Sequence, residues 1–179
     1  MNIGFDFDKI FINYPPFIPG NLIDRLYKKR SNGVLLYRFP NYPEVIIRKA
    51  THYPLFRPPI TENIDFLKQL VKNKEHKYYL ISSRFGFLKN ETNYLIKKYG
   101  FDKMFHQLYF SFDNKQPHLF KDGVIKKIKI HRYIDDDLPL LNFLANSSPG
   151  TLFFWLNRKK KEKLDKNLRA IVHISEMFH

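Results

Sequence analysis

The spacing of apolar residues along the chain predicts strands and helices in alternation. From Thr61 to Lys74, apolar side chains recur every three or four positions, which is the period of a helix. Short apolar runs predict five strands. The first begins at position 3 and ends in two aspartates, Asp6 and Asp8, and the others cover 77–83, 107–112, 132–137 and 151–156. Further helices are predicted over 89–99, 122–129, 138–145 and 159–168. Strands that alternate with helices are typical of an α/β fold whose mainly parallel sheet is covered on both faces.

Prolines interrupt this pattern between the first strand and Thr61. The stretches 13–20 and 53–59 are too rich in proline to continue a regular element. Short helices are expected over 21–30 and 42–51, with a turn at 31–33. A segment of this size cannot form a core of its own. We therefore expect one domain over 1–179, with 13–59 as a small helical insertion, called the inserted segment below.

Composition and charge narrow the class of protein. The chain has 179 residues, 44% of them hydrophobic and 27% charged, which is the profile of one soluble domain. It has no cysteine, which excludes disulfides, thiolate metal sites and a cysteine nucleophile. Lys and Arg exceed Asp and Glu by 31 − 17 = 14, which favours anionic partners unless the scattered lysines are simply solvated. Without an 18-residue apolar run, we expect a cytoplasmic protein with no membrane span.

Polar residues stand where three of the predicted strands end. They are Asp6 and Asp8 after the first, Ser82 and Ser83 after the second, and Asp135, Asp136 and Asp137 after the fourth. Because parallel strands end at the same edge of a sheet, these side chains are expected to lie together there, near a basic residue, Lys121. Clustered carboxylates repel each other, and a divalent cation offsets this repulsion. The alternative for Asp6 and Asp8 is an ordinary turn after a strand.

These residues, taken in order, resemble the motifs of the haloacid dehalogenase-like hydrolases, most of which are phosphatases. The matching stretches are Asp6-Phe7-Asp8, Leu80-Ile81-Ser82, Lys121 and Tyr133-Ile134-Asp135-Asp136. The inserted segment stands where this family commonly places its cap. The resemblance covers nearly the whole chain and implies a Rossmann-like three-layer sandwich.

The resemblance also implies a mechanism. Asp6 would attack phosphorus to form an aspartyl-phosphate, and Asp8 would protonate the leaving oxygen and later deprotonate water. Ser82 would donate a hydrogen bond to the phosphoryl group, whose charge Lys121 would neutralise. Mg²⁺ would lie between Asp6, the carbonyl of Asp8 and Asp136, with Asp135 beside it.

Several of these positions have alternatives. Ser82 could instead cap a helix or turn, with Ser83 in its place. Any of three lysines could replace Lys121: Lys126, Lys127 or Lys129. Asp137 is better suited to cap the helix that starts at Leu138 than to bind metal. The histidines show no spacing typical of metal ligands, so none is assigned to a metal.

Substrate binding is predicted for Ser83, Lys9 and Arg84. Lys9 departs from the family, which commonly has glycine there, and it either adds charge for the substrate or signals altered chemistry. Basic residues of the inserted segment could meet a second anionic group; they are Arg38, Arg48, His52 and Arg57.

The function predicted on these grounds is Mg²⁺-dependent hydrolysis of a phosphomonoester, with a nucleotide or another small phosphorylated metabolite as substrate. A basic nucleic-acid-binding protein, or a phosphatase acting on nucleic-acid ends, is the first alternative, and it rests on the net charge. A catalytically silent member that acts through protein contacts is the second. The sequence does not indicate an oligomeric state.

Overall fold

The computed structural model of the chain describes residues 1–16, 28–31, 34–113, 115–157, 164 and 167–178. Two predicted helices lie largely outside this set. The helix over 21–30 is described only from position 28, where the chain forms a strand instead. The helix over 159–168 is described only at 164, 167 and 168, and Leu168 begins a strand rather than ending a helix.

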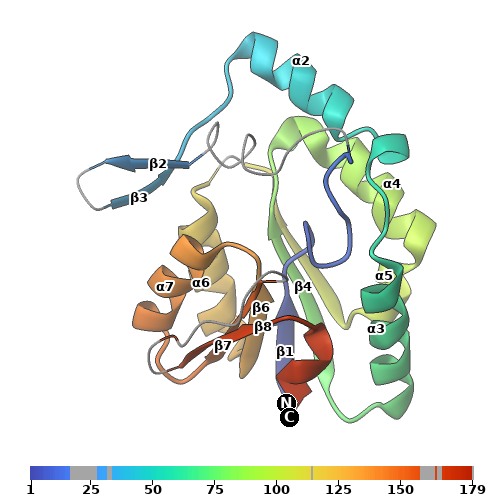
Figure 1. Cartoon of the computed structure of the whole chain (residues 1–179), viewed down its shortest axis with the longest axis vertical. Helices are drawn as coiled ribbons and strands as arrows, with labels where there is room; N and C mark the ends of the chain where they lie inside the picture. The colour runs from blue at the N-terminus through green and yellow to red at the C-terminus, as the bar shows by residue number, and fades with distance from the viewer. Residues whose placement is uncertain (17–27, 32–33, 114, 158–163, 165–166, 179) are drawn as a thin grey trace.

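A six-stranded sheet runs through the molecule, and each neighbouring pair of its strands is parallel (Figure 1). Its strands are, in spatial order, β5 (Gln107–Ser111), β4 (Lys77–Ser83), β1 (Asn2–Phe5), β6 (Arg132–Asp135), β7 (Leu152–Leu156) and β8 (Leu168–Ile171). The predicted α/β class is confirmed. The predicted count of five strands is wrong, because β8 follows a lysine-rich stretch whose pattern favours a helix.

Helices cover both faces of this sheet, which makes three layers (Figure 1). One face carries α3 (Thr61–Asn73), α4 (Lys89–Tyr99) and α5 (Phe101–Met104), and the other carries α6 (Pro117–Ile128) and α7 (Leu138–Ser147). Successive strand residues point to opposite faces, so Leu80 joins one apolar core and Ile81 the other. Short 3₁₀ helices follow β4 (η2, Gly86–Leu88) and β8 (η3, Ile174–Phe178).

The inserted segment was predicted to be helical, but its described part also contains strands. It contains an antiparallel hairpin of β2 (Lys28–Ser31) and β3 (Val34–Tyr37), then α2 (Tyr42–Thr51) and a 3₁₀ turn, η1 (Pro54–Phe56). Helix α2 has the predicted bounds, and Asn41 and Glu44 close its first turn by a reciprocal capping box.

The two ends of the inserted segment are joined by backbone hydrogen bonds. The amide of Asn13 donates to the carbonyl of Pro58 at 2.8 Å, and the amide of Ile60 donates to the carbonyl of Phe11 at 2.8 Å. The inserted segment therefore leaves the core and returns to it at one place, just beyond the end of β1, where α3 begins. Within the described residues, no helix has both the length and the apolar character needed to cross a membrane.

Candidate active site

The three strands that end in the predicted polar motifs are neighbours at the centre of the sheet. β1 pairs with β4 on one side and with β6 on the other, and Phe5 lies level with both Leu80 and Ile134. Asp6 follows Phe5 at once, and its amide donates to the carbonyl of Ile134 at 3.0 Å. The strand order therefore brings Asp6, which directly follows β1, beside Asp135, the last residue of β6.

Lys121 of α6 lies between these two carboxylates. Its Nζ is 2.7 Å from Asp6 Oδ1 and 2.7 Å from Asp135 Oδ2. All three side chains are buried. Burial alone would lower the pKa of Lys121, but Asp135 and Asp6 raise it well above its usual range, so the lysine stays charged. The alternative lysines at 126, 127 and 129 are exposed.

A glycine in β1 makes room for another partner of Asp135. A Cβ atom on Gly4 would lie 2.8 Å from Cδ2 of Tyr133, closer than real side chains come. The ring of Tyr133 therefore lies directly over the Gly4 backbone, and its hydroxyl donates to Asp135 Oδ2 at 3.0 Å. The amide of Asp137 donates to Asp135 Oδ1 at 3.1 Å, so both oxygens of this carboxylate are held.

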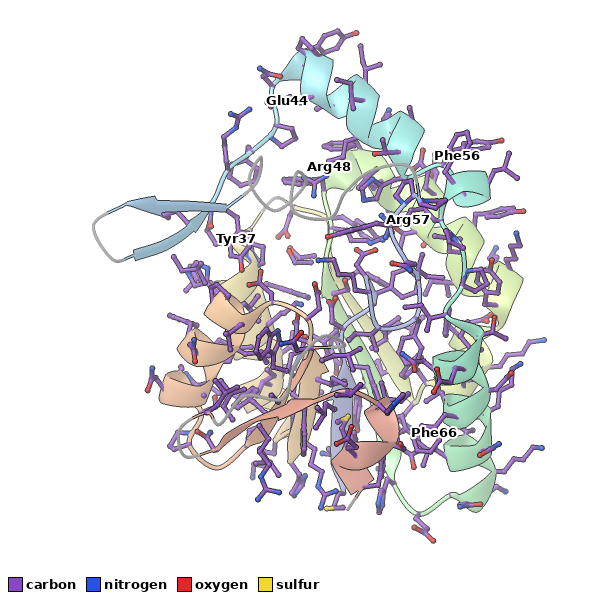
Figure 2. The ribbon with its side chains drawn as sticks, in the orientation of Figure 1. Tyr37, Glu44, Arg48, Phe56, Arg57 and Phe66 are labelled. Carbon is purple, nitrogen blue, oxygen red and sulfur yellow. The ribbon has the colours of Figure 1, made fainter. Side chains whose placement is uncertain are left out.

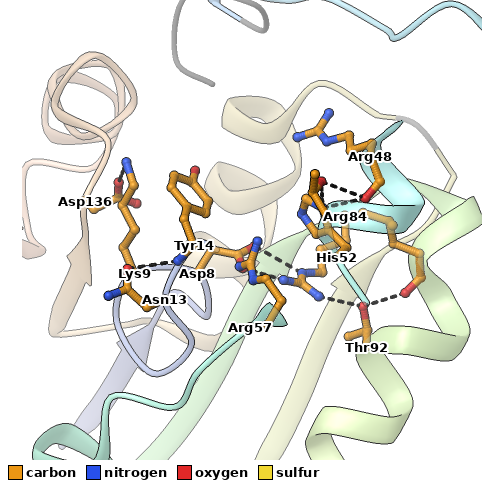
Figure 3. Close-up of polar contacts among 12 residues, drawn as sticks. Asp8, Lys9, Asn13, Tyr14, Arg48, His52, Arg57, Arg84, Thr92 and Asp136 are labelled. Atoms are coloured by element: carbon orange, nitrogen blue, oxygen red, sulfur yellow. Dashed lines mark hydrogen bonds and ion pairs between the residues drawn. The ribbon is translucent and has the colours of Figure 1, made fainter. Parts of the chain in front are cut away.

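Two arginines hold Asp8 on the other side of the loop after β1 (Figure 3). Arg57 and Arg84 each donate from Nη2 to Asp8 Oδ1, and Arg84 Nε donates to Oδ2 at 3.1 Å. Arg84 Nη1 also donates to Thr92 Oγ1 at 2.9 Å. Burial would raise the pKa of Asp8, but the guanidiniums of Arg84 and Arg57 hold it well below its usual range. Asp8 is therefore a carboxylate at neutral pH.

Lys9 turns the chain back and reaches another carboxylate. Its backbone has a φ of 58°, in the left-handed region, and the amide of Phe11 donates to the carbonyl of Phe7 at 3.0 Å. The Lys9 ammonium lies 2.8 Å from Asp136 Oδ2 (Figure 3). Of the three residues predicted to bind substrate, Ser83 and Arg84 line the cavity, and Arg84 also contacts Asp8. Lys9 is not among the residues that line it and contacts Asp136 instead.

The acidic cluster is suited to a divalent cation. Carboxylate oxygens of Asp6, Asp135 and Asp136 lie within 4.8 Å of one another. Burial raises the pKa of Asp6 to about 7 against the opposing effect of Lys121, and it raises the pKa of Asp136 to about 6 against that of Lys9. Three carboxylates share two ammonium groups here, those of Lys121 and Lys9, so negative charge is in excess. Oxygen donors with excess charge are the ligands that Mg²⁺ prefers, so the residues fit this ion.

Asp137 caps α7, as the sequence predicted. Its side chain accepts from the amide of Leu140, and its Oδ2 accepts from the hydroxyl of Tyr37 at 2.7 Å. The backbone of Tyr37 also exchanges two hydrogen bonds with the side chain of Gln116, which precedes α6. The end of the hairpin is thus attached to the core beside the carboxylates.

A cavity of about 150 Å³ opens over these groups. Its floor includes Asp6, Lys121 and Ser82, and the inserted segment contributes Tyr37 and Arg48, which lie beyond the strand ends in Figure 2. The next helical elements have N-cap positions at 85 and 88, so Ser82 does not cap them. Other residues predicted from the sequence also line the cavity: Asp8, Arg38, His52, Ser83, Arg84, Asp135 and Asp136.

The contacts of Arg57 and Arg84 with Asp8 could not be found from the sequence. These arginines are 49 and 76 positions away from Asp8, and neither belongs to a local motif. Arg57 was expected to meet a substrate, yet it is fully buried against Asp8. In the sequence, these contacts are indicated solely by the position of Arg84, which directly follows the two serines at the end of β4.

No family model and no curated protein matches this sequence. Solved structures do match it. YfnB from Bacillus subtilis, assigned to the HAD hydrolases and bound to magnesium in its crystal, gives a TM-score of 0.60 at 12% identity, over 99% of this chain and 96% of that one. A HAD-superfamily hydrolase from Ehrlichia chaffeensis gives 0.54 at 14%, over 98% and 93%. The haloacid dehalogenase-like protein SP0104 from Streptococcus pneumoniae gives 0.53 at 12%, over 87% and 84%. At these identities the likeness concerns the fold.

Proposed function

Because this chain has the fold of the haloacid dehalogenase-like hydrolases, we propose that it is a Mg²⁺-dependent phosphomonoester hydrolase acting on a nucleotide or another small phosphorylated metabolite. The observation that carries the proposal is the buried ammonium of Lys121 held between Asp6 and Asp135 at the floor of the cavity. The carboxylate of Asp6, the proposed nucleophile, thus lies beside the fixed positive charge of Lys121. Attack on an anionic phosphoryl group needs this arrangement.

In the proposed reaction Asp6 attacks phosphorus, which forms an oxygen–phosphorus bond and breaks the bond to the leaving oxygen. Water then attacks the aspartyl-phosphate, which releases inorganic phosphate and restores the carboxylate of Asp6. Lys121 offsets the charge of the phosphoryl oxygens, and the hydroxyl of Ser82 donates a hydrogen bond to one of them.

Asp8 is the proton carrier in this proposal. In the first step it gives the leaving oxygen a proton that it must first take up against the effect of Arg57 and Arg84, and in the second step its carboxylate takes a proton from the attacking water. Arg57 and Arg84 keep it in the carboxylate form, which is the form that the second step requires. They also fix the direction of its oxygens, because both guanidiniums are buried.

The carboxylates of Asp6, Asp135 and Asp136, with the backbone carbonyl of Asp8, are the groups that would hold Mg²⁺. When bound, this ion supplies positive charge that offsets the negative charge gathered around the phosphoryl group. The chain's own contribution is to hold these carboxylates together through Lys121, Tyr133 and Lys9.

The inserted segment is proposed to act as a cap that selects the substrate. Tyr37, Arg48 and His52 of this segment line the same cavity as Asp6. Its two ends are hydrogen-bonded to each other beside Asp8, so it joins the core next to the reacting groups. Selectivity is therefore expected to depend on residues of the segment that face the cavity.

Release of inorganic phosphate from a panel of phosphomonoesters, with and without Mg²⁺, tests the proposal. We expect turnover by the wild type with Mg²⁺ and none by Asp6→Asn. Asp65→Asn is the matched control, since Asp65 is an exposed helical residue that pairs with Lys68 at the surface, and it should keep full activity. Turnover that persists in Asp6→Asn, or a folded wild type inactive on the whole panel, would contradict the proposal.

A further inference from the structure

One cavity is shared by the acidic cluster and by a pair of aromatic side chains. Phe39 follows β3 and Phe85 follows β4; their ring centroids are 5.8 Å apart, with the planes at 72°. We call this pair the aromatic wall, and both of its members line the cavity. Phe39 is 47% exposed, so its ring has free surface on which another flat group can pack.

The aromatic wall is held in place by three parts of the chain. The guanidinium carbon of Arg48, from α2, lies 4.5 Å from the ring centroid of Phe85. Phe85 also stacks on Phe87, with centroids 5.3 Å apart and planes at 4°. A Cβ atom on Gly86 would lie 2.6 Å from the carbonyl oxygen of Phe112, so only glycine allows this loop to come so near the one after β5. The position of Phe85 is therefore set by packing.

Positive charge surrounds the same cavity. Arg38 and Lys115 line it together with Arg48. Arg38 pairs with Glu44, and Lys115 Nζ lies 3.1 Å from Asp113 Oδ2. Both pairs are partly exposed to solvent, where ion pairs are weak and other anions can compete. The cavity thus offers a site for a phosphoryl group, an aromatic surface and additional cations.

We infer that the cavity binds a phosphomonoester attached to a nucleoside, with the nucleobase stacked on Phe39 of the aromatic wall. This inference rests on the proposed function, since the phosphoryl group must reach Asp6. A sugar phosphate has no flat ring and leaves the aromatic wall unmatched, whereas every nucleobase has a π-face that stacks on phenylalanine. Mononucleotides and phosphorylated ends of nucleic-acid strands share this chemistry.

The test compares kcat/KM for adenosine monophosphate and ribose 5-phosphate, which differ by the base. We expect the wild type to prefer the nucleotide by about tenfold or more, the usual scale of one base–aromatic stack. Phe39→Ala should lose this preference through a higher KM for the nucleotide, with ribose 5-phosphate unchanged. Phe39→Trp should keep it. Tyr53→Ala is the matched control: Tyr53 is an exposed aromatic of the inserted segment that does not line the cavity.

An oligonucleotide with a terminal phosphate distinguishes the two sources of the base. If its kcat/KM exceeds that of the mononucleotide and falls steeply with salt, strand ends are the preferred source. If the mononucleotide has the higher kcat/KM, free nucleotides are the preferred source. Both results support a nucleobase site. Equal kcat/KM for adenosine monophosphate and ribose 5-phosphate in the wild type, or an equal loss on both in Phe39→Ala, would overturn it.

Calorimetric binding to Asp6→Asn separates this inference from the proposed function. Binding needs no turnover, so the nucleotide should bind Asp6→Asn more tightly than ribose 5-phosphate does, and the added Phe39→Ala change should remove the difference. If the wild type hydrolyses neither compound but this binding difference is found, the proposed reaction fails while the nucleobase site stands. If hydrolysis occurs and the difference is absent, the nucleobase site fails alone.

Discussion

Replacing Lys121 by methionine removes the only ammonium that contacts both Asp6 and Asp135 among the described residues, while the side chain keeps a similar length. Both carboxylates stay buried, and each loses a partner at 2.7 Å. Breaking a buried pair in this way costs about 3–5 kcal/mol of the free energy of unfolding. For a chain of this size, each kcal/mol lowers Tm by about 2–4 °C, so we expect a loss of roughly 6–20 °C.

The pH dependence of this loss follows from the acidic partner. Burial already raises the pKa of Asp6 to about 7, and without the lysine it rises further. Because of this raised pKa, the folded state takes up a proton more readily than the unfolded state does. Acid therefore relieves the repulsion between the carboxylates of Asp6 and Asp135, and alkali restores it. The destabilisation by Lys121→Met should therefore be larger at about pH 8 than at about pH 6 when measured in EDTA.

Urea unfolding followed by tryptophan fluorescence measures this loss. The chain has one tryptophan, Trp155, whose Nε1 donates to the carbonyl of Asp136 at 3.1 Å, so its signal reports on this part of the fold. Lys126→Met on the same helix is the matched control. Lys126 is exposed and pairs with Asp122, a contact worth at most about 1 kcal/mol. If the two variants lose equal stability, the reasoning about the buried lysine is refuted.

Three further predictions concern stability. Burial lowers the pKa of His118, so its contribution to stability is present above the ordinary histidine pKa of about 6.5 and is lost as the pH falls. His118→Gln should therefore lose less Tm than the wild type between about pH 7.5 and about pH 5.5, and an equal loss would argue against this reasoning. Thr92→Val removes the acceptor of Arg84 Nη1 in a buried position and should cost about 1–3 kcal/mol in urea unfolding; an unchanged midpoint would argue against the contact. Leu67→Ala, at a fully buried position of α3, should cost about 2–5 kcal/mol, and a loss below that range would mean that the core closes around the cavity.

Elements with a strong local pattern were predicted with their observed bounds. This is true of β4 (Lys77–Ser83), α2 (Tyr42–Thr51) and α4 (Lys89–Tyr99), and Gly100 ends α4 with a φ of 71° as its position suggested. Their periodicity and end signals lie within the segment itself. The hairpin of the inserted segment and β8 were missed because their strands are short. Prolines lie near the hairpin and a lysine-rich stretch precedes β8, and both hide the alternation that is typical of a strand.

The acidic motifs were recognised because a parallel sheet gathers the ends of its strands at one edge. That rule places Asp6 and Asp135 near each other from the strand sequences alone. Lys121 was a good candidate because it stood at the start of the helix predicted over 122–129; the observed helix, α6, begins earlier, at Pro117. The distances that support these choices came from the structure, and the roles in catalysis stay predictions.

The sequence by itself determined the α/β class, the order of the polar motifs and the kinds of side chain at each strand end, because these depend on residues close together in the chain. Only the tertiary structure decided which distant side chains meet: Arg57 and Arg84 at Asp8, Tyr37 at Asp137, and the aromatic wall over the cavity. Such contacts depend on how the inserted segment returns to the core and how two loops pack. A local pattern carries no information about either, because both are set by the balance of packing over the whole chain.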